Sequence, residues 1–185
     1  MKIAGIDYSL TSPSVCIFDG DEWSWENCTF HYLVMKEKNV VQSKTFKGSI
    51  YPKYDGDVQR YDNLGKWAAN IISKAGVNRV FLEGYAFGAT GRVFQIAENT
   101  GILKHHLWKT GRKYDVFPPT TVKKFATQKG NANKELMYEW FVKETGIDIR
   151  HELAISSKNQ WNPLSDIVDA YYIAKMGYEK ENGRL

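Results

Sequence analysis

The sequence predicts one α/β domain built on a mixed five-stranded sheet, and four observations support this. The chain of 185 residues has the length of a single domain. With 43% hydrophobic residues it can fill a core. Three short apolar runs come first, separated by polar turns, as in an antiparallel meander. Helical and strand patterns alternate after residue 58, and this order is typical of α/β sheets flanked by helices. The single domain is expected to span residues 1–185.

The first half of the chain supplies the meander and one helix. Strands are expected at 2–7, 14–18 and 29–35. The next segment, 36–56, is polar and rich in Gly, Lys and Tyr, which predicts a mobile loop. From Val58 apolar residues recur at helical spacing until Gly76 ends the pattern.

The second half alternates strands with helices. Strands are expected at 79–83 and 114–117. Helices are expected at 92–110, from Pro118 onward, at 133–145, and from Asn162-Pro163 to about residue 180, with a flexible tail at 181–185.

Composition excludes several classes of protein. Cys16 and Cys28 are the only cysteines, and no Cys/His cluster surrounds them, so neither a disulfide scaffold nor a zinc site is expected. No apolar run approaches the ~18 residues of a membrane span. The N-terminus lacks the apolar stretch of a signal peptide. We therefore expect a cytoplasmic protein without a membrane partner.

Positive charge is concentrated in residues 104–134, which contain eight Lys or Arg and a single acid, Asp115, for a net charge of +7. A patch of this kind suits a polyanion, with nucleic acid as the leading candidate. The alternative is a solvated basic face without a ligand.

Four carboxylates stand where a purely structural acid is hard to justify. Asp7 and Glu83 each end an apolar strand, and Asp166 and Asp169 share one face of the last helix among apolar neighbours. The helix dipole alone could account for Asp166. Clustered buried carboxylates repel one another, and a divalent cation such as Mg²⁺ or Mn²⁺ would neutralise them. Together with the basic stretch, this set favours metal-assisted phosphodiester hydrolysis.

Four segments contain these carboxylates and part of the basic stretch: IAGIDYSLTSPSVCIF, RVFLEGYAF, PPTTVKKFATQKGNANKELM and NPLSDIVDAYYIA. In order and spacing they resemble the motifs of the RuvC family of Holliday junction resolvases, and the small size of the chain is similar to that of phage or viral members. The turn after the first motif departs from the family, with Tyr8-Ser9 in place of Pro-Gly.

The resemblance implies an RNase H-like fold and a Mg²⁺-dependent endonuclease that resolves four-way DNA junctions by paired symmetric cuts. It implies that Asp7, Glu83, Asp166 and Asp169 hold two Mg²⁺ ions, which Mn²⁺ could replace. Tyr8, Ser9 and Ser165 border these expected ligands.

The resemblance also implies DNA contacts. It places Lys123 and Lys134 at phosphates near the cut, with Lys134 in a catalytic role. Lys124 and Lys129 would add general attraction to DNA. An aromatic wedge is expected at Tyr85 or Phe87, with Phe87 preferred; the alternative is a ring packed on the sheet.

Phe94, Gly101 and Trp108 recur at seven-residue spacing on the 92–110 helix. A heptad seam predicts helix pairing, and family members are homodimers, so we expect a homodimer through this helix. The alternative is one thicker core face.

Two further functions stay open at this stage. One is a nuclease of the same fold that cuts branched DNA more broadly, or cuts RNA. The other is a junction-binding protein without catalytic activity. The sequence preference of cleavage is not predicted.

Overall fold

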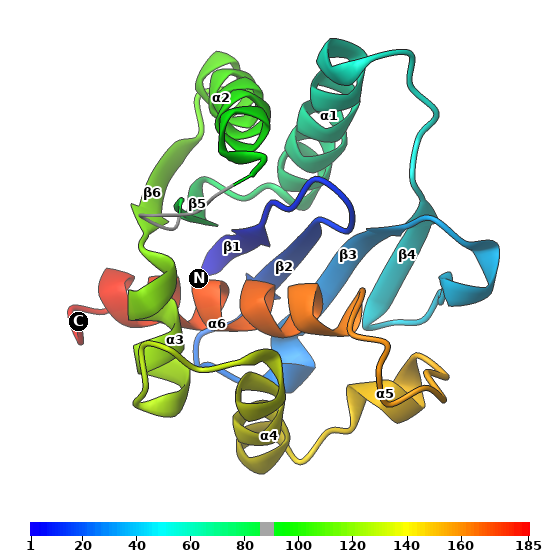
Figure 1. Ribbon diagram of the computed structural model, residues 1–185. Coiled ribbons are helices and arrows are strands. Elements are labelled where there is room, and N and C mark those ends of the chain that lie inside the picture. The colour runs from blue at the N-terminus through cyan, green and yellow to red at the C-terminus, as the bar shows by residue number, and fades with distance from the viewer. Residues whose placement is uncertain (86–90) are drawn as a thin grey trace.

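A computed structural model describes residues 1–85 and 91–185. Its centre is a six-stranded sheet with the strand order β4-β3-β2-β1-β5-β6 (Figure 1). Strands β1 to β3 pair antiparallel, whereas β4, β5 and β6 each run parallel to the neighbour on their inner side. The predicted mixed sheet and its antiparallel meander are confirmed. The strands are β1 (Lys2–Asp7), β2 (Ser14–Asp19), β3 (Cys28–Val34), β4 (Phe46–Ile50), β5 (Arg79–Glu83) and β6 (Lys113–Phe117).

The prediction of five strands is wrong because β4 lies within 36–56, the segment interpreted as a loop. β4 is a short edge strand whose only large buried side chain is Phe46, so its sequence shows no apolar alternation. Gly48 lies against the Tyr32 ring, where a Cβ atom would come within 2.7 Å of ring atoms. A short 3₁₀ helix, Glu37–Asn39, precedes it.

Helices cover both faces of the sheet (Figure 1). Helices α1 (Asp57–Ala75) and α2 (Val93–Lys109) pack on one face, and α6 (Leu164–Glu181) crosses the other. The remaining helices lie on the α6 side: α3 (Pro119–Thr127), α4 (Lys134–Thr145) and the short α5 (Ile149–Glu152), which the sequence analysis does not predict. None of the helices described is long and apolar enough to cross a membrane.

The pleat of the two central strands decides which side chains meet α6. Successive side chains on a strand point to opposite faces. Ile3 and Phe81 belong to the core under α6, whereas Ala4 and Val80 belong to the core under α1 and α2. The odd-numbered residues of β1 and β5 therefore face α6, and the acids that end the two strands do so as well.

Two glycines allow α6 to lie directly on the sheet. A Cβ atom on Gly5 would come within 2.2 Å of the Ala174 backbone nitrogen, and one on Gly177 within 2.2 Å of the Phe81 ring. Asp169 precedes Ala174 by five residues, or ~7.5 Å of helix. Asp7 lies two residues, or ~6.6 Å, beyond Gly5 along β1. The close packing therefore brings Asp169 level with the end of β1.

Candidate active site

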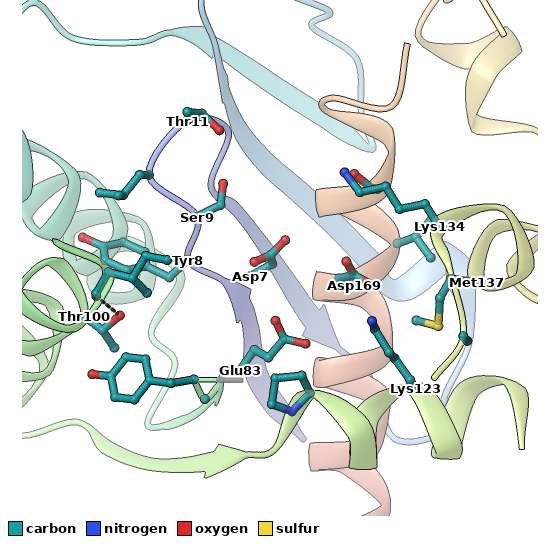
Figure 2. Close-up of a pocket in the computed structure, with 18 of the residues that line it drawn as sticks. Asp7, Tyr8, Ser9, Thr11, Glu83, Thr100, Lys123, Lys134, Met137 and Asp169 are labelled. Atoms are coloured by element: carbon teal, nitrogen blue, oxygen red, sulfur yellow. Dashed lines mark hydrogen bonds between the residues drawn. The ribbon is translucent and has the colours of Figure 1, made fainter. Parts of the chain in front are cut away.

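Six charged side chains from distant parts of the chain, three acidic and three basic, line one pocket of about 550 Å³ at the carboxyl ends of β1 and β5. Figure 2 shows three carboxylates turned toward one another, with two lysines reaching in from the side of α3 and α4. Six of the candidate residues predicted from sequence line this pocket: Asp7, Glu83, Tyr85, Lys123, Lys134 and Asp169. Arg92, which sequence analysis does not single out, lines it as well.

The fourth predicted carboxylate, Asp166, lies in the wall behind this pocket. Its side chain is buried and accepts hydrogen bonds from the hydroxyls of Ser12 (2.9 Å) and Ser9 (3.3 Å). The Ser12 backbone N–H also donates to the Ser9 hydroxyl, at 3.0 Å. The turn after β1 therefore folds around Asp166. Sequence analysis notes Ser9 beside the site but misses Ser12, whose only signal is its place in that polar turn.

A buried arginine holds the same turn from the opposite face of the sheet. The Arg60 guanidinium donates to the Leu10 carbonyl (2.6 Å) and to the Tyr51 hydroxyl (2.9 Å). Tyr51 in turn donates to the Leu10 carbonyl, at 2.7 Å. These bonds fix the backbone between Asp7 and Ser12, and nothing in the local sequence of α1 indicates them.

All four carboxyl groups have pKa values above their ordinary range. Burial raises the pKa of Asp7, with further repulsion from Asp166, Glu83 and Asp169. Burial raises the pKa of Glu83 to about 7 and that of Asp166 to about 6. Burial and then repulsion from Glu83 raise the pKa of Asp169 to about 8. Burial is the largest cause at all four carboxyls, and repulsion between them adds to it at Asp7 and Asp169, so a bound cation would favour their ionised forms.

The donor set has the chemistry of a magnesium site, although its side chains do not form a ready-made cage. Among the residues described, no three acidic, His or Cys side chains stand close enough to hold a metal ion as they are placed. Their mutual repulsion favours this spreading, and a divalent cation would remove it. Oxygen-only ligands are those that Mg²⁺ and Mn²⁺ prefer. The residues therefore fit such an ion once their side chains rotate inward.

The lysines of the basic stretch separate into two places. Lys123 and Lys134 line the pocket, where their charges lower the pKa values of the neighbouring carboxyls. Lys124 and Lys129 are exposed and do not line it. Three residues from the first part of the basic stretch, Lys104, Arg112 and Lys113, line a separate hollow near the end of α2. Trp108 lines the same hollow.

Of the two candidate wedge residues, the structure describes only one. Tyr85 lines the pocket with 39% of its surface exposed, and Lys104 Nζ lies 5.6 Å from the centre of its ring. The role of Tyr85 as an aromatic wedge stays a prediction. Phe87 lies outside the described residues.

The heptad positions of α2 point away from the core. Phe94 is 80% and Trp108 72% exposed, and a Cβ atom on Gly101 would meet nothing within 4 Å. The core-facing residues of this helix include Leu103 and Leu107 instead. The alternative of one thicker core face is therefore wrong, and pairing through α2 stays a prediction.

Comparison with known proteins places the fold. Neither a family model nor a curated protein matches the sequence. In structure, the chain is similar along its whole length to Holliday junction resolvases, and this confirms the predicted RNase H-like fold.

Three solved structures illustrate this likeness. RuvC of Thermus thermophilus, in complex with Holliday junction substrate, aligns with a TM-score of 0.65 and 14% identity over 100% of this chain and 97% of RuvC. The fowlpox virus resolvase, in complex with Holliday junction DNA, aligns with a TM-score of 0.56 and 17% identity over 98% of this chain and 99% of the resolvase. The yeast mitochondrial Holliday junction resolvase Ydc2 aligns with a TM-score of 0.53 and 12% identity over 98% of this chain and 82% of Ydc2.

Proposed function

We propose that the protein is a metal-dependent endonuclease that resolves four-way DNA junctions by paired symmetric cuts. The observation that carries the proposal is the pocket itself, where Asp7, Glu83 and Asp169 converge beside Lys123 and Lys134. Proteins of this fold solved with junction DNA include RuvC and the fowlpox virus resolvase. A cluster of carboxylates beside cationic side chains is the arrangement that phosphodiester hydrolysis requires.

Each side chain has a distinct task in this proposal. Asp7, Glu83 and Asp169, supported by Asp166, would hold two Mg²⁺ ions, for which Mn²⁺ could substitute. When bound, the metal supplies Lewis-acid activation of water and neutralises charge on the phosphate. Lys134 begins α4, whose N-cap Asn133 accepts a hydrogen bond from the Leu136 backbone N–H, and this fixes the backbone that carries the lysine.

The two lysines would act on the phosphate that is cut. Both enter the pocket from the α3 and α4 side, opposite the strands that carry Asp7 and Glu83 (Figure 2). Lys123 would orient the phosphate, and Lys134 would stabilise the negative charge that develops on its oxygens. Lys124 and Lys129, exposed outside the pocket, would add attraction for the DNA backbone.

We further propose that the active species is a homodimer. One chain carries one set of carboxylates, whereas resolution of a junction needs two cuts at opposed positions. A two-fold dimer places two sites in that relation because its interface repeats the same patch on both subunits. Phe94 and Trp108, exposed on one side of α2, are the apolar surface that would form this interface.

A substrate panel tests the proposal. The purified protein is incubated with an immobile four-way junction, a fork, a flap, plain duplex and an RNA duplex, each with Mg²⁺, Mn²⁺ or EDTA. We expect the junction to be cut fastest, in either metal and not in EDTA. Faster cutting of RNA or of plain duplex would contradict the proposed substrate. Tight junction binding without cutting in either metal would indicate a binding protein instead.

A further inference from the structure

A second hollow, of about 480 Å³, adjoins the active site on the β3 side. One wall is the segment that follows β3, and the other is the segment that precedes α6. We call it the β3 groove and define it by six of its lining residues: Ser12, Lys36, Lys38, Asn39, Gln160 and Trp161.

The groove continues the pocket around the turn that follows β1. Thr11 lines both hollows. Ser12 lines the groove, while its hydroxyl donates to Asp166 at 2.9 Å. Strand β3 runs parallel to β1, because both pair antiparallel with β2. In the sheet register Asp7 lies opposite Ser14, and Ser14 lies opposite Tyr32. The residues after β3 therefore lie at the same edge of the sheet as the carboxylates. A strand leaving the active site past this turn would enter the groove.

The wall before α6 is held in place by Arg150. Its guanidinium donates to the carbonyl of Ser157 at 3.0 Å, to that of Gln160 at 3.2 Å and to that of Lys158 at 3.3 Å. The same guanidinium lies 4.7 Å from the centre of the Trp161 ring. The Gln160 amide also reaches across to the Asn39 side chain, at 3.5 Å. The groove is thus a built feature with an aromatic ring fixed in one wall.

The chemistry of the groove fits a nucleic acid strand. Lys36 and Lys38 are exposed cations, and no carboxylate is among the described residues that line the groove. Cations track a phosphate backbone, aromatic rings stack on bases, and side-chain amides pair with base edges. An acidic peptide would use the lysines but would leave the indole without a matching group.

We propose that the β3 groove binds the DNA strand that flanks the cut, and that its amides give the cut a base preference. The inference rests on the proposed nuclease function, because it identifies where the substrate of that site continues. Sequence analysis assigns basic contacts only to residues 104–134, so this surface lies outside that prediction.

Binding measurements in EDTA test the groove without requiring cleavage. The double variant Lys36→Gln/Lys38→Gln is compared with Lys44→Gln/Lys74→Gln, which removes two exposed lysines toward the opposite edge of the sheet. Loss of two phosphate contacts should lower the log–log salt slope of DNA binding by ~1.4 to 1.8 for the groove variant only. Equal salt slopes of DNA binding for the two variants would overturn the proposal.

The aromatic and amide residues are tested separately. Trp161→Ala should weaken binding of a single-stranded oligonucleotide about 5-fold or more, and Trp161→Phe should restore it. Melting curves establish that each variant folds, since Trp161 also packs against Arg150. With junctions randomised around the cut, Gln160→Ala should flatten base preference at one flanking position. The proposal would be overturned if Gln160→Ala left the base preference unchanged and Trp161→Ala left oligonucleotide binding unchanged. Failure of the wild-type protein to cut any junction would refute the nuclease function alone.

Discussion

Replacing Glu83 by Gln should stabilise the metal-free protein at neutral pH while removing activity. Burial raises the pKa of Glu83 from 4.5 to about 7. Since the folded-state value lies above the unfolded one, ionisation opposes folding, and wild-type stability falls as pH rises from about 4.5 through about 7. One pKa unit corresponds to ~1.4 kcal/mol, so the ionised Glu83 costs the folded state about 3 kcal/mol above pH 7.

The variant should therefore melt higher than wild type in EDTA at pH 8. For a domain of this size ~1 kcal/mol corresponds to about 2–4 °C, which gives an increase of roughly 6–12 °C. At pH 5 the cost is below about 1 kcal/mol, so the two proteins should melt within about 4 °C of each other. Glu139→Gln, which removes an exposed carboxylate of α4, is the matched control and should change neither melting point.

Magnesium completes this test. A cation that binds only the folded state raises its stability by an amount that grows with the logarithm of the cation concentration relative to its Kd. Mg²⁺ at pH 8 should raise the melting temperatures of wild type and of Glu139→Gln. It should raise the melting temperature of Glu83→Gln much less. The reasoning would be refuted if Glu83→Gln melted below wild type in EDTA at pH 8. It would also be refuted if Mg²⁺ raised the melting temperature of Glu83→Gln as much as that of wild type.

Four further substitutions test the remaining roles. Asp7→Asn should abolish cleavage and preserve junction binding in a gel shift, because it removes a ligand charge without adding bulk; retained cleavage would remove Asp7 from the metal site. Lys134→Ala should slow cleavage more than it weakens binding, whereas Lys129→Ala should mainly lower the salt slope of binding by ~0.9; equal effects in kinetic and binding assays would mean that only bulk charge matters. Trp108→Glu should weaken dimerisation by several kcal/mol, roughly, because it buries an unpaired charge; a monomer in light scattering that still resolves junctions would exclude the proposed interface.

The strand carboxylates of the site are predictable from sequence because they obey local rules. Asp7 and Glu83 end apolar strands, and the two-residue pleat places both on the face that α6 covers. Asp166 and Asp169 lie three apart on one helix, so they share a face. These patterns need no knowledge of distant contacts.

Features that depend on distant contacts are not predictable in this way. Arg60 reaches a carbonyl 50 residues away, and α1 gives no sign of it. β4 contains a single large core residue, Phe46, and takes its strand conformation from pairing with β3. The β3 groove joins segments that are more than 100 residues apart, as the contact between Asn39 and Gln160 shows.

Cut-site mapping on an immobile four-way junction tests the central claim most directly. Each of the four strands is end-labelled in turn, the protein is added with Mg²⁺, and the products are sized and then treated with ligase. Asp7→Asn protein purified in the same way controls for contaminating nuclease. The account predicts two cuts at symmetry-related positions in opposed strands, with nicked duplex products that ligase seals and no cutting by Asp7→Asn. Unpaired cuts, products that resist ligation, or equal cutting by Asp7→Asn would contradict it.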